Sequence, residues 1–263
     1  LFSLNKNVKF SFYNVDLSKS NLNQIKKVQF VIHCASHTNA QGSFAIKKEM
    51  FRNNISCMKN IINYCQKNNS KLIHISSTSV YGKQAKIVSE SDVKLLKPQS
   101  PYAEIKLTEE KMLKNKKIKY MTFRFGTIAG VSKGMRFHTA INKFCLNASF
   151  NEDIHIYKTA FKQFRPYLSL KDAFKTFKFC IENNLFNNDI YNVLSGNFTV
   201  EQIVKMIRKH KKKLKIKFVV TQIMNQLSYH VSGAKLKNLG INLNASINND
   251  IKETLKLFKN IKY

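Results

Sequence analysis

The sequence predicts an α/β fold built on a doubly wound parallel sheet, with a smaller C-terminal α/β lobe. Two nearly continuous apolar runs, residues 28–35 and 71–76, are short and contain β-branched side chains, which is typical of strands buried on both faces. A helical pattern that extends to about residue 68 separates them, and a second helix over 102–115 precedes another buried strand over 121–125. Strands that alternate with helices in this way indicate parallel pairing through crossover helices.

Shorter patterns predict the remaining elements. Alternation of apolar and polar residues over 8–13 predicts a half-buried strand, while residues 14–20 form a turn and 21–27 a short helix. Thr199 and Gln202 have the spacing of a capping box, which marks the start of a helix. The second half is predicted to contain helices over 137–149, 199–212 and 246–258 and strands over 191–194 and 215–220.

Composition limits the classes of protein that the chain can belong to. Its 263 residues carry a formal net charge of +30, and 43% of them are apolar, so a substantial core is possible and intrinsic disorder is excluded. Five of the 45 basic residues are arginine and the other 40 are lysine. Because Lys, Asn and Phe have AT-rich codons, a drifted genome explains this charge, and we do not expect a nucleic-acid partner. No run of 18 apolar residues is present, so no membrane-spanning helix is expected.

The cysteine and histidine residues show no sign of a metal or disulfide framework. The five cysteines are odd in number and lack C-x-x-C spacing. His37, His74 and His138 have no metal-ligand spacing, and His33, inside an apolar strand, is expected to be a hydrogen-bonded core residue. Since no signal-peptide pattern is present, the cytoplasm is the expected compartment.

Small and hydroxylated residues follow the predicted strands, which is where open parallel sheets bind ligands. Small side chains let a cofactor approach the backbone, and hydroxyl groups supply oriented hydrogen bonds. The segments are Asp16-Leu17, Ala35-Ser36, Ser76 to Ser79, and Gly126-Thr127.

Tyr102 and Lys106 stand four residues apart on the helix that follows the serine-rich segment. The two side chains share one helix face, and a cation beside a phenol lowers its pKa, which makes the phenol a usable base near neutral pH. Tyr167 and Lys171 have the same spacing. With 40 lysines in the chain, about one or two of the ten tyrosines should have a lysine four residues later by chance. Tyr167 lies in a segment that is predicted to be extended, so context favours Tyr102.

Further motifs extend this pattern along the chain. They are Val31 to Ala35, Asn54, Ile75 to Gly82, Tyr102-x-x-x-Lys106, Arg124 to Thr127 with Gly130, Arg165-Pro166-Tyr167 and Tyr191 to Val193. In this order they resemble the extended short-chain dehydrogenases/reductases of the NAD-dependent epimerase/dehydratase family, the group that contains UDP-glucose 4-epimerase. The resemblance runs from residue 8 to the C-terminus. It implies a Rossmann-like fold that binds NAD, with NADP as the alternative, and a nucleotide-sugar substrate.

The resemblance also implies roles for individual residues. Ser77 would hydrogen-bond the reacting oxygen of the substrate, Tyr102 would exchange a proton with it, and Lys106 would bind the nicotinamide ribose and hold the tyrosine pKa down. The other cofactor contacts would be Asp16, Leu17, Ala35, Ser36, Asn54, Ser76 and Phe125, and the substrate contacts would be Ser79, Thr127 and Arg165. Ordinary roles compete with these: a turn residue for Asp16, a helix cap for Asn54 and a surface ion pair for Arg165.

Two features depart from the family pattern. The glycine-rich G-x-x-G-x-x-G turn that would hold the cofactor pyrophosphate is not in the sequence. We therefore expect either a fragment of a longer gene product, which Leu1 favours, or a truncated chain with weakened cofactor binding. Thr78 and Ser79 stand where some sugar dehydratases carry Asp-Glu to expel water, so we expect epimerisation, reduction or oxidation and not dehydration.

Several functions stay open. An epimerase-like oxidoreductase in polysaccharide or cell-surface sugar synthesis is favoured because Ser77, Tyr102 and Lys106 are all present. The alternatives are an NAD(P)-dependent reductase of another carbonyl compound, a non-catalytic relative that binds NAD(P) or RNA, and a non-functional remnant.

The resemblance implies a domain division and an assembly. Residues 1–130 would form a partial NAD(P)-binding domain, and residues 131–263 a mostly substrate-binding lobe interleaved with late elements of the sheet. A homodimer would form through the helices near 45–68 and 102–115.

Overall fold

A four-stranded parallel sheet organises the N-terminal two thirds of the protein, as a computed structural model shows for residues 9–38, 42–220 and 228–259. Its strand order is β1 (Phe30–His33), β2 (Lys71–Ser77), β4 (Tyr120–Phe125) and β8 (Asp189–Val193). All neighbouring pairs are parallel. The predicted parallel α/β sheet is therefore confirmed, and β8 comes from the second half of the sequence.

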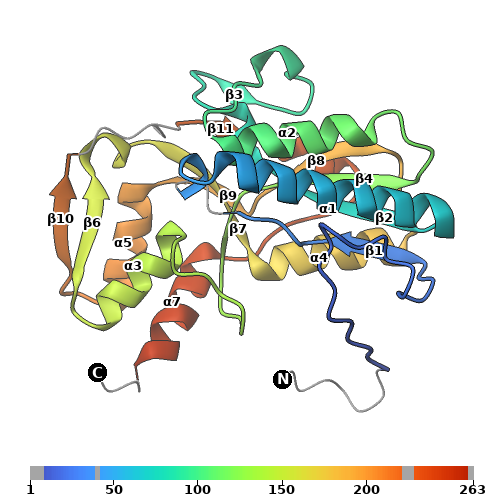
Figure 1. Ribbon diagram of the computed structural model, residues 1–263. Coiled ribbons are helices and arrows are strands. Elements are labelled where there is room, and N and C mark those ends of the chain that lie inside the picture. The colour runs from blue at the N-terminus through green and yellow to red at the C-terminus, as the bar shows by residue number, and fades with distance from the viewer. Residues whose placement is uncertain (1–8, 39–41, 221–227, 260–263) are drawn as a thin grey trace.

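Helices cover both faces of this sheet (Figure 1). On one face lie α1 (Lys47–Asn68) and α2 (Pro101–Leu113), and on the other lie α4 (Leu170–Glu182) and α6 (Ala234–Asn238). Because side chains alternate along a strand, even-numbered residues of β2 and β4 face α1 and α2, whereas odd-numbered residues enter the core beneath α4. None of the helices in the described ranges has both the length and the apolar character needed to cross a membrane.

Most of the remaining elements form a second core. A three-stranded sheet contains β5 (Thr127–Ala129), β7 (Phe164–Ser169) and β9 (Gly196–Thr199). The predicted capping box is confirmed, since Thr199 and Gln202 bond each other's backbone N–H groups at the start of α5. The other elements of this part are α3 (Ala140–Ser149), α5 (Val200–His210), α7 (Ile247–Phe258) and the strand pairs β6 (Asp153–Tyr157) with β10 (Lys215–Val219) and β3 (Ile87–Val88) with β11 (His230–Val231).

Two N-terminal predictions are wrong. Residues 9–13 form no strand; Phe10 and Phe12 are 57% and 79% exposed, and no neighbouring strand pairs with them in the described structure. Residues 21–27 form turns and not a helix. The Ser20 hydroxyl accepts the Leu22 backbone N–H at 3.0 Å, and Leu22 adopts a φ of 60°. Such local side-chain bonds compete with helix hydrogen bonds.

The turn after β2 depends on Gly82, so its substitution is a test of the fold around the site. Gly82 has a φ of +63°, and a Cβ there would lie 2.0 Å from the Lys97 carbonyl oxygen. We expect Gly82→Ala to lower the free energy of unfolding by about 2 kcal/mol or more, because both the conformation and the contact oppose a side chain. Gly134→Ala is the matched control, since nothing lies within 4 Å of its added Cβ. Equal stability of the two variants in urea titrations would contradict this account.

Candidate active site

Ser77 lies at the carboxyl end of β2, where its side chain caps the short 3-10 turn Thr78–Tyr81. Its Oγ accepts the backbone N–H of Ser79 at 3.2 Å and the Ser79 hydroxyl at 2.9 Å. Because the Ser77 oxygen receives two hydrogen bonds, its own proton is free to be donated. The Ser77 hydroxyl also lies close enough to the Tyr102 phenol to lower its pKa, so the structure brings these two predicted residues together.

The start of α2 sets the position of Tyr102. Ser100 caps this helix by accepting the Ala103 N–H at 3.2 Å, and Pro101 occupies its first turn. Tyr102 is therefore in the first turn and half-buried, with Lys106 one turn further on. The Lys106 Nζ lies 5.9 Å from the centre of the Tyr102 ring, on the face that the sequence spacing predicted.

The pKa of Tyr102 is raised, whereas the sequence led us to expect a lowered pKa. Burial raises the pKa of the Tyr102 phenol above its ordinary value, and the nearby Glu109 carboxylate adds to this. The Lys106 ammonium and the nearby Ser77 hydroxyl act in the opposite direction but do not outweigh burial. The phenol is thus protonated at neutral pH, and Lys106 limits the rise without reversing it.

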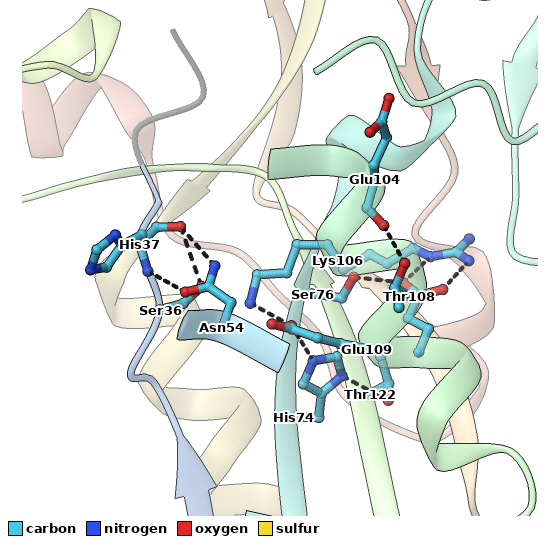
Figure 2. Close-up of polar contacts among 12 residues, drawn as sticks. Ser36, His37, Asn54, His74, Ser76, Glu104, Lys106, Thr108, Glu109 and Thr122 are labelled. Carbon is cyan, nitrogen blue, oxygen red and sulfur yellow. Dashed lines mark hydrogen bonds and ion pairs between the residues drawn. The ribbon is translucent and has the colours of Figure 1, made fainter. Parts of the chain in front are cut away.

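A buried ion pair that the sequence reasoning missed holds Lys106 (Figure 2). Its Nζ donates to Glu109 Oε2 at 2.8 Å, and the same oxygen lies 3.0 Å from His74 Nε2. His74 Nδ1 is 3.3 Å from the Thr122 hydroxyl on β4. Burial by itself would lower the pKa of Lys106, but the Glu109 carboxylate holds it above its ordinary value.

A second buried pair lies beside the first and involves Ser76. Arg124 forms a two-pronged contact with Glu110, with Nε to Oε1 at 2.9 Å and Nη2 to Oε2 at 2.7 Å. Arg124 Nη1 also donates to the Tyr81 hydroxyl at 2.9 Å. The Ser76 hydroxyl donates to Glu110 Oε1 at 2.6 Å and is buried beneath α2. Its side chain therefore supports the helix and does not face the same way as Ser77.

Asn54 braces the segment that follows β1. It is fully buried in α1, its Oδ1 accepts the His37 N–H at 2.9 Å, and its amide donates to the His37 carbonyl at 3.2 Å (Figure 2). Ala35 and Ser36 lie in this segment, with Ala35 exposed and Ser36 half-buried. Asn54 thus positions the backbone of two predicted cofactor contacts and is not the N-cap of α1, which begins at Lys47.

Three predicted cofactor contacts are in ordinary structural settings. Asp16 is exposed and accepts the backbone N–H of Ser18 at 2.9 Å, as a turn residue does. Leu17 packs against the core beneath α1. The Phe125 ring lies in the core on the α4 side of the sheet, 5.7 Å from the Phe177 ring, so its side chain points away from α2.

The predicted substrate contacts Thr127 and Arg165 lie on neighbouring strands. Thr127 on β5 pairs with Tyr167 on β7, which places Arg165 two residues away along β7. Arg165 is half-buried, and its charge favours the phenolate form of Tyr229. Tyr229, which the sequence reasoning missed, has its hydroxyl 3.4 Å from the Thr78 hydroxyl and is close enough to Tyr102 for their charges to interact. Tyr229 therefore connects the strand with Arg165 to the end of β2.

These features agree with a match to a family model. The model is described as the NAD-dependent epimerase/dehydratase family and matches residues 2–193 of this chain. The chain belongs to this family. A curated relative from Arabidopsis thaliana, a trifunctional UDP-glucose 4,6-dehydratase, 3,5-epimerase and 4-keto-L-rhamnose reductase, is 23% identical over 94% of this chain. The chain spans 39% of the length of that relative.

Solved structures of several sugar-nucleotide enzymes share the fold. The Thermus thermophilus UDP-glucose 4-epimerase complex with NAD has a TM-score of 0.83 at 19% identity, covering 98% of this chain and 86% of that one. The Bacillus cereus UDP-glucuronic acid 4-epimerase, in complex with UDP-glucuronic acid and NAD, has a TM-score of 0.81 at 23% identity, covering 94% and 79%. The Rossmann-like fold predicted from the motifs is therefore confirmed.

The expectation that His33 is hydrogen-bonded is wrong. His33 is 4% exposed and stacks on His74 at 6.5 Å, but neither of its ring nitrogens has a partner in the described part of the chain. Burial lowers its pKa to about 4, and the electrostatic effects of His74 and Lys106 act in the same direction.

The low His33 pKa predicts a loss of stability in mild acid. The unfolded chain takes up a proton on this histidine below its ordinary pKa of 6.5, whereas the folded chain resists it until about pH 4. Between pH 6.5 and about pH 4, this difference in proton uptake lowers the free energy of unfolding by about 3 kcal/mol. Urea titrations at pH 7 and pH 4 should show His33→Leu losing less stability than the unaltered protein. His155→Leu, at an exposed site on β6, is the control, and an equal loss in all three proteins would contradict the assignment.

Proposed function

We propose that this protein is an NAD-dependent oxidoreductase of nucleotide sugars with 4-epimerase-type chemistry. The observation that carries the proposal is that Ser77 at the carboxyl end of β2 lies near Tyr102 in the first turn of α2, with the Lys106 Nζ 5.9 Å from the Tyr102 ring. Ligands of open parallel sheets bind at this end. Family membership and the fold shared with sugar-nucleotide epimerases support the same substrate class.

The residues near Lys106 fit the nicotinamide end of the cofactor. Of the three N–H groups of the Lys106 ammonium, one is bonded to Glu109, which leaves two donors for ribose hydroxyls. The exposed backbone at Ala35, braced by Asn54, offers an approach without a bulky side chain. The sequence has no glycine-rich turn for the pyrophosphate, so this chain by itself should bind NAD weakly.

The chemistry divides between the cofactor and three side chains. Bound NAD, held at its nicotinamide ribose by Lys106, would supply the hydride acceptor for the sugar C4 carbon. Tyr102, as the phenolate, takes the proton of the C4 hydroxyl as that carbon becomes a ketone, and gives it back in the reverse step. Ser77 would donate a hydrogen bond to the same oxygen and keep its proton, and Lys106 favours the phenolate.

The residues after Ser77 favour epimerisation, oxidation or reduction over dehydration. Thr78 is buried, and its hydroxyl donates to the Phe125 carbonyl at 3.2 Å. Ser79 donates to Ser77. Neither residue supplies a carboxylic acid to protonate a leaving hydroxyl.

Arg165 supports a substrate that carries a pyrophosphate. Its planar fork suits two phosphate oxygens, and it lies on β7 beside the strand that carries Thr127. We propose that residues 131–263 supply most of this substrate side and residues 1–130 most of the cofactor side. The proposed homodimer would bury α1 and α2, which pack side by side and leave Phe51 43% exposed.

Turnover of UDP-glucose by a Tyr102→Phe variant tests the proposal. With millimolar NAD to offset weak binding, we expect the unaltered chain to convert UDP-glucose and the variant to be slower by at least about 10²-fold, because the base is lost. NAD affinity should change little. Tyr157→Phe, on β6, is the control. Equal turnover by the Tyr102→Phe variant would refute the assigned base, and release of an oxidised or reduced sugar would indicate a dehydrogenase or reductase.

A further inference from the structure

We propose that Glu109 is a positioning residue that acts through Lys106. Its carboxylate is the fixed counterion of the Lys106 ammonium and, with His74 behind it, determines where that ammonium lies against Tyr102. This inference rests on the proposed roles of Tyr102 and Lys106, and it adds Glu109 and His74, to which the resemblance gives no role.

The three side chains form a continuous buried line from the site into the protein. The Lys106 side chain is 4% exposed, and those of Glu109 and His74 are fully buried. One carboxylate oxygen, Oε2, receives both the ammonium at 2.8 Å and the imidazole at 3.0 Å. Two partners on one oxygen fix the carboxylate, because moving it would break both contacts in a region without solvent.

The other carboxylate oxygen shows that the arrangement is not optimised for stability. Glu109 Oε1 is buried and has no hydrogen-bond partner in the described part of the chain. An unsatisfied buried acceptor costs free energy, and an apolar side chain at this position would avoid the cost. A costly group beside a catalytic lysine indicates a functional reason for keeping it.

Glu109 opposes the effect of Lys106 on the ionisation of Tyr102. From α2, Lys106 favours the phenolate and Glu109 opposes it; Ser77 of β2 and Arg136 favour the phenolate. Tyr229 interacts with the Tyr102 charge from the segment before β11. Glu109 thus offsets the Lys106 charge in the free protein, and the base would ionise when a cationic nicotinamide ring binds beside it.

The Glu109→Gln variant tests this role without requiring turnover. Removing one negative charge should lower the pH at which the Tyr102–Lys106 pair loses its protons. We expect the pKa of Tyr102, followed by NMR of tyrosines labelled with ¹³C at Cζ, to fall by about one unit. A Tyr102→Phe spectrum assigns the signal. Glu104→Gln is the matched control, since Glu104 is an acidic residue on the same helix whose side chain is 47% exposed. An unchanged Tyr102 titration in a folded Glu109→Gln protein would overturn the proposal.

A measurement on the unaltered protein covers the case in which Glu109→Gln does not fold. A carboxylate at Nε2 requires the proton of His74 to be on that nitrogen, so ¹⁵N NMR of labelled histidines should show the Nε2–H form. A proton on Nδ1 alone would overturn the proposal. If UDP-glucose is not turned over but both NMR results hold, the proposed reaction fails while the role of Glu109 stands. If UDP-glucose is turned over but either NMR result fails, the proposed role of Glu109 fails while the proposed reaction stands.

Discussion

The structure around the site depends on the pairing of charges that α2 carries into the protein interior. Lys106, Glu109 and Glu110 are all buried beneath this helix. A buried charge without a partner costs several kcal/mol, so each requires a complementary group, which for Lys106 is Glu109 itself. Glu109 meets His74 on β2, and Glu110 meets Arg124 on β4. These contacts fix the rotation and the height of α2, and with them the place of Tyr102 above the end of β2.

This constraint explains why the sheet is polar on one face only. Along β2 and β4 the polar residues that face α2 are His74, Ser76, Thr122 and Arg124, whereas Ile73, Met121 and Phe123 fill the core on the other side. The net charge of +30 has little part in this. Among the described residues, Lys106 and Arg124 are the cations buried in the interior.

Short apolar runs and long amphipathic helices predicted the sheet, α1, α2 and α5. In contrast, α4 was missed because its buried face carries the polar residues Asp172 and Thr176. The strand predicted over 8–13 shows that alternation alone does not make a strand without a neighbour to pair with.

The part of the site that lies at a strand end or within one helical turn could be predicted from the sequence. Ser77, Tyr102 and Lys106 meet because one residue ends a strand and the others are one helical turn apart. Ser76 and Phe125 were assigned by motif position, yet the Ser76 hydroxyl bonds Glu110 beneath α2 and the Phe125 ring lies in the core on the α4 side of the sheet. Glu109 and His74 lie 35 residues apart in sequence, and only the packing of α2 on β2 brings them together.

A crystal structure of this chain with NAD and UDP-glucose would test the central claim most directly. The account predicts that the sugar C4 oxygen lies within hydrogen-bond distance of both Ser77 Oγ and the Tyr102 hydroxyl, with the nicotinamide ribose on Lys106 and the Glu109 contact retained. A nucleotide sugar bound away from the end of β2, or a ribose bound with Lys106 turned elsewhere, would contradict it.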